Sequence, residues 1–86
     1  MPMNTVAFSG FISSVTENGR FAVVELDATS RSKIGDFKVI ISRDTRGRTG
    51  LMNGKGYIDK DTPVTGEARF GPEALDAVEV KVAEIA

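Results

Sequence analysis

The sequence predicts an all-β fold, a small barrel of five short strands. Short segments rich in Val, Ile and Phe recur along the 86 residues, and several of them alternate apolar with polar positions. One connection, Thr16-Glu17-Asn18-Gly19, carries the Asn-Gly pair that favours a tight hairpin turn. The other connections are rich in glycine and polar residues. Together these observations are typical of a five-stranded antiparallel barrel of the OB or SH3-like kind.

Residues 6–15 form the first predicted strand, with apolar residues at the even positions Val6, Phe8 and Ile12. Gly10 in its middle suggests a bulge or a tight bend. The second predicted strand spans residues 21–26. Its alternation places one set of side chains inward (Ala22, Val24, Leu26) and the other outward (Phe21, Val23, Glu25).

The middle of the chain is predicted to hold one strand between two loops. Residues 27–35 are polar and contain turn formers, so we expect a loop, and residues 37–41 are expected to form the third strand. Four glycines among basic and polar residues predict a long flexible loop at about 43–60, with at most a short ordered piece at 51–52.

The last third is predicted to supply two more strands. Because proline cannot pair centrally in a sheet, the fourth strand is expected to begin after Pro63, at Val64, and to end at Phe70, before a turn at Gly71-Pro72. Residues 74–86 fit either a strand or a helix. Three valines at a spacing of two favour the strand.

The amino-acid composition limits the functions that we expect of this chain. The length indicates a single domain, residues 1–86. The chain has no cysteine and no histidine, which removes disulfides, thiolate metal sites and the usual nucleophile–base pairs. We therefore expect no enzyme activity, no catalytic residues, no cofactor and no metal site; two carboxylates at 59–61 are more typical of a turn. Without a signal peptide or an apolar span, the expectation is a cytoplasmic protein with no membrane segment.

Charge is segregated along the chain. Residues 31–60 contain eight of the eleven basic residues and three acids, so this window carries +5 while the rest of the chain carries −6. Basic surfaces commonly contact phosphates, because Lys and Arg release counterions from nucleic acid. Uneven scatter of charge on a small domain is the alternative interpretation.

Three segments resemble the first three strands of the bacterial cold-shock domain: Gly10-Phe11-Ile12, Arg20-Phe21-Ala22-Val23-Val24 and Asp36-Phe37-Lys38-Val39-Ile40-Ile41-Ser42. Gly71-Pro72-Glu73-Ala74 resembles the turn before the final strand of that family. The first hairpin is also similar to the S1-like domain of bacterial translation initiation factor one. The resemblance implies an OB-type, cold-shock-like barrel that binds single-stranded nucleic acid. It departs from the family motif in that Phe21 alone occupies a stacking position.

The expected nucleic-acid-binding residues come from two places. The resemblance and the strand alternation place Phe11, Phe21 and Lys38 on one sheet face, with Val15, Val23 and Ile40 beside them. The predicted loop contributes Arg43, Arg46, Arg48 and Lys55, which could follow a phosphate backbone. Tyr57 could stack on a base or anchor the loop by packing.

The function predicted from these residues is non-enzymatic binding of single-stranded RNA or DNA with low sequence specificity, by Phe stacking and a basic loop. The alternative is a protein-interaction or homodimerisation module, because aliphatic residues on the same face could form an apolar interface.

Overall fold

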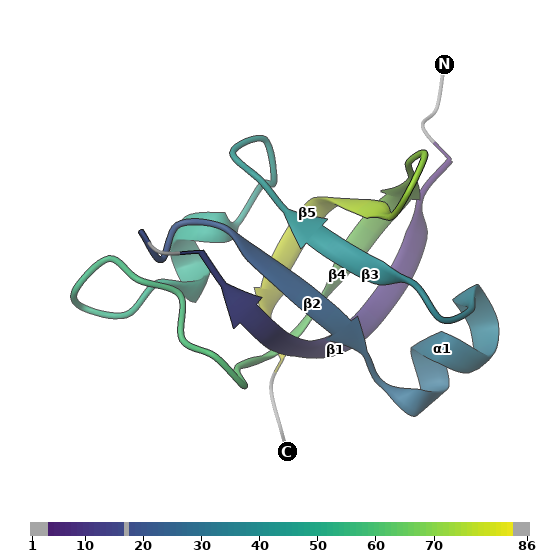
Figure 1. The fold of residues 1–86 in the computed structure, drawn as a ribbon, viewed down its shortest axis with the longest axis horizontal. Coiled ribbons are helices and arrows are strands. Elements are labelled where there is room, and N and C mark those ends of the chain that lie inside the picture. The colour runs from purple at the N-terminus through teal and green to yellow at the C-terminus, as the bar shows by residue number, and fades with distance from the viewer. Residues whose placement is uncertain (1–3, 17, 84–86) are drawn as a thin grey trace.

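Five strands close into a barrel in the computed structural model, which describes residues 4–16 and 18–83 (Figure 1). The strands are β1 (Val6–Val15), β2 (Ala22–Leu26), β3 (Lys38–Ile41), β4 (Pro63–Phe70) and β5 (Leu75–Val82). Around the barrel they follow the order β1-β2-β3-β5-β4. The predicted five-stranded barrel is confirmed. Neighbouring strands are antiparallel except β3 and β5, which are parallel.

Most strand predictions are confirmed. The first strand has the predicted bounds, and the last segment is a strand rather than a helix. Pro63 is the first residue of β4, where its missing N–H is tolerated. On β2 the inward set is buried as predicted. With residues from the other strands and from the 51–58 segment, these side chains form the core: Phe8, Ile12, Ala22, Val24, Leu26, Val39, Ile41, Leu51, Ile58, Val64, Ala68, Leu75, Ala77 and Val80.

The predicted loop at 27–35 is wrong, because Ala28–Ile34 form helix α1. Asp27 caps its N-terminus: its Oδ1 accepts a hydrogen bond from the Ser30 N–H at 2.9 Å. Gly35, with φ of 112°, ends the helix. The buried Ser30 also accepts from the Ser9 N–H at 2.8 Å, and the Ser9 hydroxyl donates to Asp27. These hydrogen bonds therefore hold the start of the helix against β1.

The hydrogen bonds at the helix cap also set the ionisation of Asp27. The Ser9 hydroxyl, followed by the Ser30 N–H, stabilises the charged carboxylate and lowers the pKa of Asp27 below its ordinary value.

The connection at 43–60 is long, as predicted, and contains one short ordered piece, but it is held to the barrel at several points. Arg48–Leu51 form a short 3₁₀ helix, η1, and the Leu51 and Ile58 side chains enter the core. The Arg46 N–H donates to the Val78 carbonyl, and the Val80 N–H donates to the Arg46 carbonyl, both at 2.9 Å. Arg46 thus continues the sheet beside β5 after β3 has ended.

The predicted irregularity in β1 exists, but the register shift falls between Ile12 and Ser14 rather than at Gly10. Beyond it Val15 pairs with Ala22 and packs against the core, so the expected outward position of Val15 is wrong. Gly10 has a different role. A Cβ there would lie 2.1 Å from the Glu25 carbonyl oxygen, so only glycine allows β1 and β2 to approach this closely.

Within the described ranges 4–16 and 18–83, no helix has the length and apolar character needed to cross a membrane.

Replacing Gly10 with alanine should lower the free energy of unfolding by roughly 1–3 kcal/mol, because the new methyl group forces the β1 and β2 backbones apart. Urea denaturation measures this loss. Gly54→Ala is the matched control, since a Cβ at Gly54 meets no atom within 4 Å and φ there is not positive. Equal effects of the two substitutions would contradict the close approach.

Asp27→Asn tests the charge at the cap, because asparagine caps a helix about as well as aspartate. The folded-state pKa of Asp27 is lowered, so its charge stabilises the fold fully above the unfolded value of about 3.9 and loses this effect as the pH falls through the folded value. The stability gap between wild type and Asp27→Asn should therefore be constant from pH 7 to about pH 5 and shrink below about pH 4. Urea denaturation across this pH series measures the gap, and a gap independent of pH would contradict this explanation.

Candidate functional site

The outside of β1, β2 and β3 carries the strand residues of the predicted binding surface except Val15, which packs against the core. Phe11 is exposed and pairs with Glu25, which in turn pairs with the exposed Lys38. Val23 and Ile40 lie directly opposite each other on β2 and β3. The structure therefore brings the predicted strand residues together.

The predicted loop residues are mostly engaged within the protein. The Arg48 guanidinium lies over the Phe21 ring, 5.4 Å from its centroid, and donates to the Arg20 carbonyl at 2.8 Å. Tyr57 packs on the first hairpin, where a Cβ on Gly19 would lie within 2.3 Å of its ring. Tyr57 is thus an anchor of the loop. Arg43 and Lys55 are exposed.

The basic block of the sequence does not form one patch. α1, which carries Arg31 and Lys33, precedes β3, and the 43–60 segment follows it at the opposite end of that strand (Figure 1). The charges that are close in sequence are therefore divided between two ends of the barrel.

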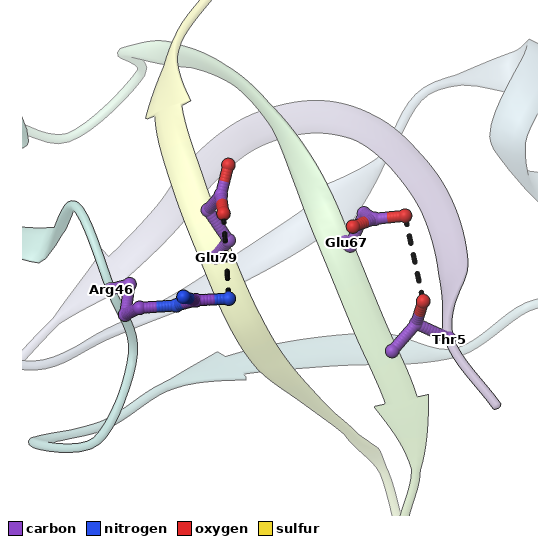
Figure 2. A network of polar contacts seen from close by, with 4 residues as sticks. All are labelled: Thr5, Arg46, Glu67 and Glu79. Carbon is purple, nitrogen blue, oxygen red and sulfur yellow. Dashed lines mark hydrogen bonds and ion pairs between the residues drawn. The ribbon is translucent and has the colours of Figure 1, made fainter. Parts of the chain in front are cut away.

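Two glutamates face each other on the outside of β4 and β5. Glu67 and Glu79 are direct cross-strand partners, an arrangement that is unfavourable for like charges. Figure 2 shows that each has another partner: Glu79 lies 3.7 Å from the Arg46 guanidinium, and Glu67 accepts from the Thr5 hydroxyl at 3.4 Å. Arg46, predicted to contact phosphate, therefore offsets the repulsion between carboxylates.

Charged side chains line a pocket where the chain leaves β3 and runs beside β5. Its volume is about 340 Å³. We call it the Asp44–Asp76 pocket, and its lining consists of Ser42, Asp44, Arg69, Asp76, Ala77 and Val78.

Hydrogen bonds hold the wall of the Asp44–Asp76 pocket in place. The buried Thr45 hydroxyl donates to the Ala77 carbonyl at 2.8 Å and accepts from the Ser42 N–H at 3.0 Å. The turn that carries Asp44 is therefore fixed to the strand that carries Asp76.

Sequence reasoning missed this pocket. Its two carboxylates, Asp44 and Asp76, lie 32 positions apart, and the parallel pairing of Ile40 with Asp76 brings the two segments together. No local motif marks such a pairing.

No protein-family model matches this sequence, and no curated protein matches it. The fold is similar to solved structures of CusF from Escherichia coli. CusF with silver(I) has a TM-score of 0.63 at 11% sequence identity, and the match covers 95% of each chain. A tryptophan-to-alanine variant of CusF with copper(II) has a TM-score of 0.61 at 11% identity, over 98% of this chain and 100% of that chain. The apo form gives 0.61 at 11% identity, over 94% and 89%. At this identity the likeness establishes the fold.

The prediction that the chain binds single-stranded RNA or DNA is wrong. The similar barrels belong to a protein whose structures are described with copper and silver ions. The arrangement of Arg46 and Arg48, each with a partner inside the protein, agrees with this correction. The alternative interaction module and the cytoplasmic location gain no support from these structures, and the resemblance to cold-shock and S1-like domains stays a prediction.

The described residues, 4–16 and 18–83, do not fit a site for a soft ion such as silver(I) or copper(I). Such soft ions are bound by thiolate, thioether and imidazole groups. The chain has no Cys, no His and three Met, of which Met52 alone lies in the described part. Among residues 4–16 and 18–83, no group of three or more His, Cys, Asp or Glu side chains could enclose a metal ion.

Proposed function

We propose that the protein is a non-enzymatic binding protein that holds a small cation in the Asp44–Asp76 pocket. The observation that carries this proposal is the presence of two carboxylates in the lining of one pocket. With the single positive charge of Arg69, the lining has a net charge of −1. A cation in the pocket would complement this negative charge by charge-assisted hydrogen bonds or by coordination.

The size of the pocket limits the kinds of ligand that it can hold. A water molecule occupies about 30 Å³ of liquid, so 340 Å³ has room for an ion with several of its waters or for a small organic ammonium group. Pockets that bind small molecules begin at about 300 Å³. Ser42 adds a hydroxyl that can donate or accept, and Ala77 and Val78 add an apolar wall.

The support for binding rather than catalysis is chemical. Without His or Cys, the chain lacks the common general base and the strongest nucleophile. The residues that line the pocket include no His, Cys or Lys. The Cu and Ag complexes of CusF support ion binding by this kind of barrel, and the oxygen donors here favour hard cations.

The test is a titration of ¹⁵N-labelled protein with Mg²⁺, Ca²⁺ and small amines such as methylamine, monitored by amide chemical shifts. One of the cations should shift the amides of residues 42–46 and 76–78, with a dissociation constant of about 10⁻⁴–10⁻³ M as in weak oxygen-donor sites. Titrating the metal ions and the amines separately shows whether the pocket binds a metal ion or an organic ammonium group. Asp76→Asn or Asp44→Asn should weaken binding by about tenfold, or 1.4 kcal/mol.

Asp36→Asn is the matched control, because it removes an exposed carboxylate outside the pocket and should leave the affinity unchanged. The proposal is rejected if no cation shifts these amides at a concentration of about 10⁻² M, which is tenfold the upper expected dissociation constant. It is also rejected if the shifts persist in the Asp44→Asn/Asp76→Asn double variant.

A further inference from the structure

The donor atoms of the described strands do not suit silver(I), the ion in one of the structural neighbours. None of the five strands contains Met, His or Cys. The barrel wall therefore presents oxygen and nitrogen from Asp, Glu, Lys, Arg, Ser and Thr, together with aliphatic and aromatic groups. Copper(I) and silver(I) bind such hard groups weakly compared with sulfur.

The thioether of Met52 is not placed to form a site. Met52 follows η1, is half-buried, packs against the core and pairs with Ile58 in an isolated bridge. The side chains that follow it are engaged by oxygen and nitrogen chemistry: Asn53 donates to Asp59 and accepts from the Lys55 N–H. A single thioether in these surroundings lacks the additional soft donors that hold these ions.

The most regular outward positions on the barrel are also without soft donors. Across β2 and β3, Val23 lies opposite Ile40 and Glu25 lies opposite Lys38. Directly opposite residues have Cβ atoms about 4.5–5.5 Å apart, close enough for two side chains to share one ion. The backbone geometry at these positions therefore suits a site with two donor atoms. The side chains there carry no sulfur or imidazole donor.

We infer that the barrel formed by residues 4–16 and 18–83 has the CusF type of fold but does not hold silver(I) or copper(I), and that missing donor atoms alone separate it from a barrel that could. This inference concerns ions and residues other than those of the Asp44–Asp76 pocket, so it can fail while the proposed function holds, and the reverse.

The first test is a calorimetric titration of the protein with silver(I) in chloride-free buffer, and with copper(I) under anaerobic reducing conditions. Wild type should form no one-to-one complex with a dissociation constant below about 10⁻⁴ M, the range of weak hard-donor sites. A one-to-one complex at micromolar or tighter affinity would overturn the inference. Met52→Leu, run in parallel, should leave the result unchanged, and a silver(I) affinity that falls in this variant would show a thioether site where none is expected.

The second test supplies the donors. Val23→Cys/Ile40→Cys, kept reduced, places two thiols opposite each other on the outer face, and it should bind one silver(I) at least a hundredfold more tightly than wild type. Far-ultraviolet circular dichroism should show the same fold. A matched control, Val23→Cys alone, should bind less tightly than the pair, since one sulfur cannot complete the two-coordinate site. If the folded double variant binds no better than wild type, donor atoms are not the sole difference and the inference is wrong.

Discussion

Close backbone approach at glycines is the constraint on which the barrel depends. At Gly10, Gly47 and Gly66 an added Cβ would lie 2.0–2.1 Å from a carbonyl oxygen of a neighbouring strand. Gly10 lies on β1, which pairs with β2 on one side and β4 on the other, so β1 must bend between the two halves of the sheet. Gly47, with φ of 84°, and Gly66 both approach β5, at Val80 and Glu79. A short barrel can close around a small core only where strands come this near.

The closure has a functional consequence at β5. Because β3 ends at Ile41, its parallel pairing with β5 is short, and Arg46 takes over as the neighbour of β5 farther along. The turn between them carries Asp44 and is held by Thr45 against Ala77. The Asp44–Asp76 pocket is therefore a result of how the barrel closes rather than an addition to it.

Much of the fold follows from local patterns in the sequence, and the candidate site does not. The alternation on β2 and the turn formers Asn18-Gly19 predict the first hairpin, and the inward set of β2 is buried as expected. The α1 segment was predicted as a loop because residues 27–35 are polar and contain turn formers. The residue that marks the start of this helix is its N-cap, Asp27. Its side chain also accepts a hydrogen bond from the Ser9 hydroxyl, eighteen positions away in the sequence. The glycines of 43–60 suggested flexibility, whereas Leu51 and Ile58 bury their side chains and hold the segment. The pocket depends on a parallel pairing between distant residues, for which the sequence carries no local mark.

The barrel matches that of a protein solved with copper and silver ions over nearly the full length of both chains, whereas the described residues of this chain include one Met and no His or Cys. The central claim is that β5 is covered on one edge by β4 and on the other by β3 and then Arg46. A nuclear Overhauser spectrum of the labelled protein tests it most directly. We expect cross-peaks that link Val39 with Leu75 and Arg46 with Val80, beside those between β5 and β4. If β5 shows contacts to β4 alone, the barrel is open at this edge, and both the closure and the pocket built on it are contradicted.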